Sequence, residues 1–183
     1  GYGGIKIYPL QKRTIDQAAI CVSKIRQTLG FNIPLMLDLA CPNDPNVSLK
    51  LAPLVKEFKP YWFEEPVDGE ATRTLLEIKN QTDLRIVTGE KQCGINHFVE
   101  TLAADAVDIF NPDISSVGGI IDMIKIIELS NKHNVRVSPH CWNSMSIAAS
   151  AMVHLCMSFP NTEMAEFFPE YIPYTLKFCN KNF

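Results

Sequence analysis

Short apolar runs alternate with segments of helical length along this chain, and that alternation limits the folds it can adopt. No tight-hairpin signal joins successive runs, so neighbouring strands are expected to be parallel. Such a sheet is either an open doubly wound sheet or a closed β/α barrel. The predicted strands are Ile5–Pro9, Pro34–Ala40, Tyr61–Pro66, Arg85–Glu90, Val107–Asp113, Arg136–His140 and Glu163–Phe168.

The segments between the predicted strands contain apolar residues at helical spacing and residues typical of helix ends. One apolar face consists of Ile15, Ala18, Ala19, Val22, Ile25 and Leu29, and a second, within residues 120–134, consists of Ile120, Met123, Ile124 and Ile127. The predicted helix starts are Thr14 or Asp16 for the first helix, Ser48 for a helix over Leu49–Phe58, and Ser144 for a late alanine-rich helix. Gly30 is typical of a helix C-terminus.

Six ionisable residues stand at or near the carboxyl ends of successive predicted strands. They are Asp38, Glu64, Glu90, Asp113, His140 and Glu166, and their separations are 26, 26, 23, 27 and 26 residues. One β/α unit of a barrel takes about 30 residues, and all strands of a barrel end at the same face. An open sheet would spread these groups along a line. The spacing therefore favours a TIM-type (β/α) barrel, and the seven predicted strands would leave it at least one strand short of eight.

Asp38, Glu64 and Glu90 form a candidate metal site. Three carboxylates at one barrel mouth would repel one another unless a cation lay among them. Ligands that are all oxygen suit a hard cation such as Mg²⁺, and Mn²⁺ would bind the same set. A single acidic residue at a loop end is more simply explained as a solvated side chain, but three on consecutive strands favour the metal.

Lys6 lies on an apolar strand, between two isoleucines. A lysine on an edge strand can point to solvent. Within a barrel strand it points either to the mouth or to the helix layer, and only the mouth accommodates a charge. Lys6 is then an electrophile or a base beside the metal, and Tyr8, two residues on, shares its side of the strand.

Asp113 and His140 end adjacent predicted strands, and an aspartate beside a histidine orients the ring as a general base. The other histidines, His97, His133 and His154, lie in helical segments and are expected to be structural or surface residues. Glu166, if protonated, would hydrogen-bond a substrate carboxylate. Trp142 and Asn143 follow His140 and would line the pocket, although Trp142 is equally suited to packing.

The composition limits the classes of partner and the cellular location that we expect for this protein. The 183 residues carry a net charge of −3 and are 46% hydrophobic, which does not suggest nucleic acid as a partner. No apolar run reaches the roughly 18 residues of a membrane span, and the six cysteines show no C-x-x-C pair. We therefore expect free thiols and a cytoplasmic location.

The motifs together resemble the mandelate racemase and muconate lactonizing group of the enolase superfamily. Trp62-Phe63-Glu64-Glu65-Pro66 resembles the Glu-Glu-Pro strand end of the family, and Asn111-Pro112-Asp113 with Val117-Gly118-Gly119 resembles its Pro-Asp-x-x-x-x-Gly-Gly stretch. By this resemblance Asp38, Glu64 and Glu90 bind metal, Asp113 and His140 form the catalytic dyad, and Glu166 is the last-strand electrophile.

The resemblance implies Mg²⁺-dependent removal of the proton next to a carboxylate, with a Lys or His base and an enediolate intermediate. Many members carry Lys-x-Lys where this chain has Lys6-Ile7-Tyr8, so a second base is missing and simple two-base racemisation is disfavoured. Some related dehydratases place a histidine acid at the position of Ala40, and Cys41 beyond it should point the other way. We expect dehydration of a sugar acid to a 2-keto-3-deoxy acid. An epimerase, a racemase or a cycloisomerase is the nearer alternative, and a non-catalytic or truncated metal-binding barrel the more distant one.

The chain begins directly on a predicted strand. We therefore expect residues 1–183 to be one partial barrel domain, with the family's capping domain and first barrel strand missing. Specificity loops of that family lie on the capping domain, so the sequence does not name the substrate. We also expect the full-length form to be a homo-oligomer, and the isolated piece not to be an independently stable enzyme, because an open barrel leaves unpaired strand edges.

Overall fold

The computed structural model describes residues 2–142, 145–175 and 177. Within these residues six short strands alternate with helices, and the strands that pair within each compact unit run parallel. The chain divides into two compact units, Gly1–Thr88 with Ala103–Asp108 and Gly89–Leu102 with Ile109–Phe183. The first unit contains β1 (Ile5–Ile7), α1 (Ile15–Leu29), β2 (Leu35–Asp38), α2 (Pro45–Val55), η1 (Lys56–Phe58), β3 (Trp62–Glu64), α3 (Thr72–Thr82) and β4 (Ile86–Thr88).

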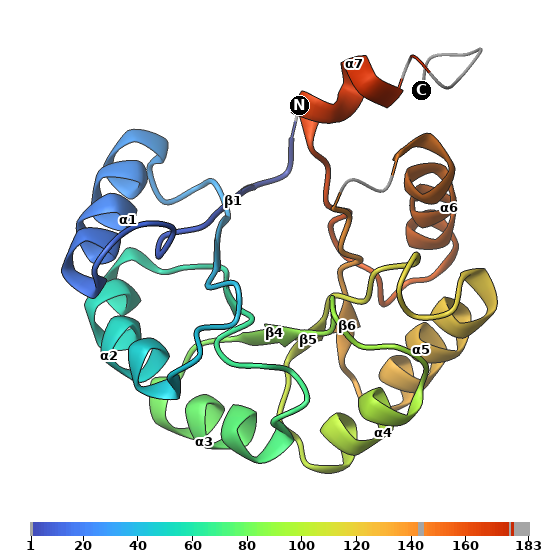
Figure 1. The fold of residues 1–183 in the computed structure, drawn as a ribbon, viewed down its shortest axis with the longest axis horizontal. Helices are drawn as coiled ribbons and strands as arrows, with labels where there is room; N and C mark the ends of the chain where they lie inside the picture. The colour runs from blue at the N-terminus through green and yellow to red at the C-terminus, as the bar shows by residue number, and fades with distance from the viewer. Residues whose placement is uncertain (1, 143–144, 176, 178–183) are drawn as a thin grey trace. The chain divides into compact units, whose positions relative to one another are not determined.

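The second unit follows the same alternation. Its elements are α4 (Asn96–Ala103), whose last residue belongs to the first unit, β5 (Ile109–Phe110), α5 (Ile120–Lys132), β6 (Arg136–Val137), α6 (Met145–Ser158), η2 (Pro169–Tyr171) and α7 (Ile172–Thr175). Figure 1 shows that in the first unit helices α1 to α3 form a layer on one side of the strands.

The strands of the first unit separate an apolar face from a polar one. Leu35, Leu37 and Phe63 pack in the core beneath the helices, together with Leu75 and Ile78 of α3. Every residue of β2 and β3 is buried, as expected for parallel strands covered on both faces. The residues between the core positions therefore face the opposite side.

Register decides which side chains meet on that opposite face. Lys6 pairs with Met36 across β1 and β2, and Asp38 pairs with Glu64 across β2 and β3. Since the side chains of a strand alternate between its faces, Lys6, Asp38 and Glu64 lie on the same face. The prediction that Lys6 points away from the helix layer is thus confirmed.

The predicted seventh strand, Glu163–Phe168, is wrong. The structure has only an isolated parallel bridge between Val137 and Thr162, and residues 163–168 have no regular secondary structure. The N–H of Glu163 donates to the carbonyl of Val137 at 2.8 Å, and a regular ladder would next need a donor from Pro139. Proline has no N–H, so the ladder stops there.

Proline also shortens β5. The N–H of Ser138 donates to Phe110 at 2.8 Å, and that of His140 donates to Pro112 at 3.1 Å. The intervening bond would need an N–H on Pro112, so Asp113 and His140 meet at an isolated bridge beyond the strands. The predicted strands over residues 107–113 and 136–140 are therefore only two residues long each.

The helix starts agree with the sequence signals in part. Thr14 caps α1 in a capping box with Gln17, and the N–H of Gly30 closes its end on Arg26. The start predicted at Ser48 is wrong, because the Asp44 side chain already accepts from the N–H of Asn46, so that α2 begins at Pro45.

Two further expectations about helices have different outcomes. In α5 the buried side chains are those of Met123, Ile126, Ile127 and Ser130, whereas Ile120 is exposed, so the predicted stripe was rotated. The start predicted at Ser144 lies outside the described residues.

Arg26 of α1 is a buried cation in the first unit. Its guanidinium donates to the carbonyls of Phe58 and Gly30 at 2.8 Å, Ile33 at 2.7 Å and Lys59 at 3.1 Å. Only 2% of the residue is exposed, so these carbonyls replace the water that the charge has lost.

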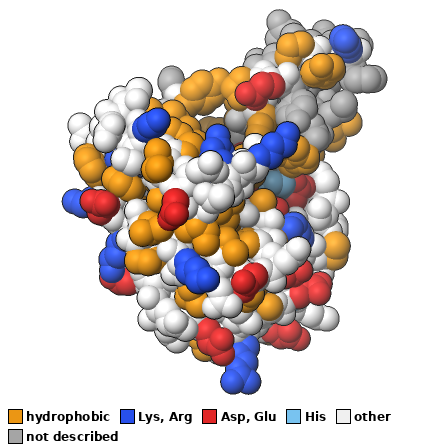
Figure 2. Space-filling view, turned by 60° about the vertical axis from the view of Figure 1, so that its left-hand side comes forward, with side chains coloured by type: hydrophobic (Ala, Val, Ile, Leu, Met, Phe, Trp, Pro, Cys, Tyr) orange, Lys and Arg blue, Asp and Glu red, His pale blue; other side chains and the backbone are white. Residues whose placement is uncertain are grey.

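Among the described residues, no helix combines the length and hydropathy needed to cross a bilayer. The cysteines that the structure describes, Cys21, Cys41, Cys93, Cys141 and Cys156, are thiols outside any disulfide, as expected. Burial raises the pKa of Cys156 to about 11. Cys179 lies outside the described residues. On the face drawn in Figure 2, side chains of both charges are scattered among hydrophobic ones.

Replacing Arg26 with Met should lower the free energy of unfolding by about 3 kcal/mol or more, because a buried acceptor left without a donor costs about 1–3 kcal/mol. Urea unfolding of the purified full-length protein measures this. Arg73→Met is the matched control, since the Arg73 side chain is 93% exposed and should change stability little. Equal stabilities of the two variants would contradict the role of Arg26.

Candidate active site

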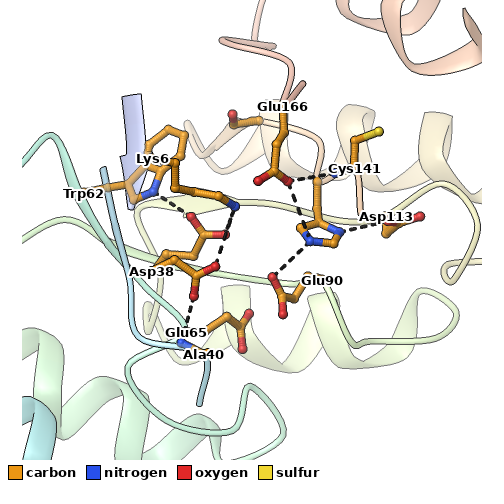
Figure 3. A network of polar contacts seen from close by, with 12 residues as sticks. Lys6, Asp38, Ala40, Trp62, Glu65, Glu90, Asp113, Cys141 and Glu166 are labelled. Atoms are coloured by element: carbon orange, nitrogen blue, oxygen red, sulfur yellow. Dashed lines mark hydrogen bonds and ion pairs between the residues drawn. The ribbon is translucent and has the colours of Figure 1, made fainter. Parts of the chain in front are cut away.

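The polar face of the first unit holds an ion-pair cluster. Lys6 Nζ lies 2.7 Å from Glu64 Oε1 and 3.7 Å from Asp38 Oδ2. The side chains of Asp38 and Glu64 are only 2% and 0% exposed, and that of Lys6 is 12% exposed. In Figure 3 the Lys6 side chain points toward Asp38, with Trp62 close by. Burial makes this pairing necessary, because an isolated charge there would be costly.

Neutral donors complete the cluster. The indole Nε1 of Trp62 donates to Glu64 Oε2 at 2.8 Å, and the N–H of Ala40 donates to Asp38 Oδ1 at 2.8 Å. Trp62 stands two residues before Glu64 and so shares its side of β3. The cluster carries two carboxylates and one ammonium, which leaves an excess of negative charge suited to a further cation.

The second unit holds the predicted dyad. Asp113 Oδ2 lies 2.8 Å from His140 Nδ1, and the N–H of Ser115 donates to Asp113 Oδ1 at 2.7 Å. Burial alone would raise the pKa of Asp113, but the hydrogen bonds with His140 and Ser115 outweigh it, and the pKa is lowered below its ordinary value. Since an ionised carboxylate only accepts, Nδ1 of His140 carries the proton and Nε2 is left to exchange one.

Two further carboxylates surround the same imidazole. Glu90 Oε2 lies 3.4 Å and Glu166 Oε2 3.6 Å from His140 Nε2. Glu166 Oε2 also accepts from the N–H of Cys141 at 2.9 Å. Figure 3 marks these contacts with dashed lines from Glu90, Asp113, Cys141 and Glu166. Three of the predicted site residues therefore converge on one imidazole within this unit.

Gly89 allows Glu90 to take its position. The φ angle of Gly89 is +142°, a backbone conformation that residues with a side chain rarely adopt. A Cβ there would lie 3.2 Å from the N of Asn111 and 3.2 Å from the ring of Phe98. Glycine therefore permits the close approach of the backbones just before Glu90.

The other predicted residues have mixed outcomes. Tyr8 is half-buried just after β1, and its catalytic role stays a prediction. The exposed ring of Trp142 packs edge-on against Phe168, with 5.1 Å between centroids, which fits the packing alternative. Asn143 lies outside the described residues. His97 and His154 lie on α4 and α6, and His133 follows α5, as expected.

Three sets of contacts in and beside these clusters were not predicted from the sequence. The indole of Trp62 and the N–H of Cys141 bind Glu64 and Glu166 directly, and Glu65 forms a buried network of its own. The two-residue spacing of Trp62 and Glu64 is a signal that could have predicted the first contact. The other two depend on backbone turns, for which the sequence offers no comparable signal.

The carboxylates fit a hard divalent cation by the chemistry of their donors. Asp38 and Glu64 present only oxygen, at paired positions of two neighbouring strands. Glu90, which belongs to the second unit, lies two residues beyond the end of β4, and its side chain also ends in a carboxylate. None of these residues supplies nitrogen or sulfur, the ligands typical of structural zinc.

Residues 1–181 match the family of enolase C-terminal domain-like proteins. The solved structure of an enolase from the environmental genome of the Sargasso Sea is 51% identical, with a TM-score of 0.93 over 98% of this chain and 48% of that chain. The predicted class, a parallel β/α barrel of the enolase superfamily, is therefore confirmed.

Enzymes with related sequences act on sugar acids. The L-talarate/galactarate dehydratase of Salmonella typhimurium is 27% identical over 92% of this chain and 40% of that protein. The D-galactonate dehydratase of Ralstonia pickettii is 33% identical over 78% of this chain and 37% of that protein. The chain thus spans about two fifths of the length of the curated relatives it matches.

One solved relative contains a metal. L-talarate dehydratase from Polaromonas sp. JS666, complexed with Mg and L-glucarate, is 27% identical with a TM-score of 0.81, over 91% of this chain and 45% of that chain.

Asp113→Asn should reduce stability at neutral pH by about 1.5–3 kcal/mol, the usual worth of hydrogen bonds to a charged group. Because the folded-state pKa of Asp113 is lowered from 3.8, its stabilising effect is present above that pH and is lost as pH falls through the lowered pKa. Urea unfolding of both proteins from pH 7 downward should show the difference shrinking below about pH 4. A difference independent of pH would contradict the assignment.

Proposed function

We propose that this chain, which belongs to the enolase C-terminal domain-like family, carries the catalytic residues of a Mg²⁺-dependent sugar-acid dehydratase. Its reaction would remove the proton α to the substrate carboxylate and yield a 2-keto-3-deoxy acid. The observation that carries the proposal is the dyad of the second unit, in which Asp113 holds Nδ1 of His140 at 2.8 Å. Relatives that are sugar-acid dehydratases support the reaction class.

The proposed metal ligands are Asp38, Glu64 and Glu90. Support comes from the paired strand-end positions of Asp38 and Glu64, from the excess negative charge of their cluster, and from the Mg-bound relative. A bound Mg²⁺ would act as a Lewis acid toward the substrate carboxylate, and Mn²⁺ would suit the same oxygens.

His140 is the proposed general base. Its Nε2 takes the α-proton, and the electrons of the C–H bond move into the carboxylate to give an enediolate. The ammonium of Lys6, already held between two carboxylates, would stabilise the added negative charge. Asp113 keeps the proton on Nδ1, so that the basic nitrogen is Nε2.

Loss of water follows from the same base. The imidazolium of His140 returns its proton to the β-hydroxyl as the C–O bond breaks, with Tyr8 as the alternative acid. One water leaves, and the resulting enol tautomerises to the 2-keto-3-deoxy acid. Glu166, in its protonated form, would donate a hydrogen bond to the substrate carboxylate.

Glu64→Gln should weaken Mg²⁺ binding to the full-length protein by at least about tenfold, because an anionic oxygen ligand is lost. Isothermal titration with Mg²⁺ alone measures this. Glu77→Gln is the control, since Glu77 is an exposed carboxylate on α3 and should leave the affinity unchanged. An unchanged affinity for Glu64→Gln would remove the metal assignment.

His140→Asn should slow exchange of the substrate α-proton with deuterated water by about 10²–10⁴-fold, the usual cost of losing a general base. Exchange is followed by NMR with a sugar-acid library, and substrate binding should persist. His133→Asn, an exposed histidine of the same unit, is the control. Full exchange in His140→Asn would refute the base, and exchange without 2-keto product in the unaltered protein would favour an epimerase.

A further inference from the structure

We propose that Glu65 is a positioning residue, which fixes the backbone turns that aim Asp38 and Glu64 and thereby sets the affinity of the metal site. This inference rests on the proposed function, because it takes Asp38 and Glu64 as metal ligands. It adds a residue outside the proposed set of metal ligands. All of the groups it uses belong to the first unit.

The carboxylate of Glu65 is fully buried and joins the ends of three strands. The Sγ of Cys41, three residues beyond β2, donates to Oε2 of Glu65 at 2.9 Å. The hydroxyl of Thr88, the last residue of β4, donates to Oε1 at 2.9 Å. Glu65 itself directly follows β3, and it is 0% exposed.

The backbone around this carboxylate is strained. Ala40, Cys41 and Glu65 have φ angles of +55°, +57° and +44°, a left-handed conformation that residues with a Cβ rarely adopt. Such residues persist only where the surrounding structure enforces them. The N–H of Cys41 donates to the carbonyl of Glu65 at 2.9 Å, so the two strained turns are also bonded to each other.

These turns determine where the proposed ligands point. The N–H of Ala40 donates to Asp38 Oδ1 at 2.8 Å, so the turn held by Cys41 also holds the Asp38 carboxylate. The turn at Glu65 leaves Glu64 facing Lys6 while Glu65 faces Cys41 and Thr88. A shift of Glu65 would therefore move both ligands.

If Glu65 served only to fill space in the core, an apolar residue would be expected at its position. An apolar side chain could fill the same buried space without the cost of burying a carboxylate. A carboxylate that accepts from two different strand ends instead fixes the distance between those ends. The network is therefore better explained by positioning than by packing.

The test uses paired variants of the two donors in the full-length protein, with Mg²⁺ as the probe. Cys41→Ala and Thr88→Val remove a donor, whereas Cys41→Ser and Thr88→Ser retain a hydroxyl. Cys41→Ala and Thr88→Val should weaken Mg²⁺ binding by about tenfold or more in isothermal titration, an effect as large as that of losing a direct hydrogen-bond partner of a metal ligand. Cys41→Ser and Thr88→Ser should retain most of the affinity for Mg²⁺.

Thr82→Val is the matched control. Thr82 is a buried threonine of the same unit, whose hydroxyl donates to the carbonyl of Ile78 at 2.9 Å, within α3. Its loss should cost stability, measured by urea unfolding, without changing the Mg²⁺ affinity. A fall in affinity that merely followed stability across Thr82→Val and Thr88→Val would overturn the positioning role.

The outcomes separate this inference from the proposed function. If the unaltered protein binds Mg²⁺ and Glu64→Gln loses it, but the alanine and valine variants bind normally, the inference fails and the metal site stands. If Glu64→Gln binds Mg²⁺ as the unaltered protein does, the proposed metal site itself fails. Should Thr88→Val not fold, the Cys41 pair decides alone, because Cys41 is only partly buried.

Discussion

The parallel register of β1, β2 and β3 is the constraint on which the first half of the site depends. Asp38 lies opposite Glu64, and Lys6 on the neighbouring strand lies opposite Met36, two residues before Asp38. A slip of one residue would turn Leu37 to the polar face and force the charge of Asp38 into the apolar core. The burial that stabilises this unit therefore also selects the register in which the charged side chains meet.

Much of this arrangement could be predicted from residue types alone. Alternation of apolar and polar positions places Lys6, Asp38 and Glu64 on one side of the strands, and the polar residue at each strand end follows from the repeat length. The pairing of Asp113 with His140 follows from the same spacing, and the structure brings their side chains to 2.8 Å.

Other features could not be predicted because they depend on which backbone groups remain to be paired. The run over residues 163–168 is apolar enough for a strand, yet Pro139 offers no N–H to it. Ser48 is a good capping residue, but Asp44 and Pro45 come earlier and start the helix first. The network of Glu65 depends on left-handed turns at Ala40 and Cys41, which residue types alone would not suggest.

The carbonyl contacts of Arg26 also affect how the first unit comes apart. This side chain, on α1, bonds to carbonyls of Phe58 and Lys59, which lie 32 and 33 residues further along the chain. If α1 moved away from the turn around η1, these hydrogen bonds would break. Either the cation or several of the carbonyls would then be left buried without a partner, which is costly. These segments, distant in sequence, are therefore expected to open together as one cooperative unit rather than to fray independently.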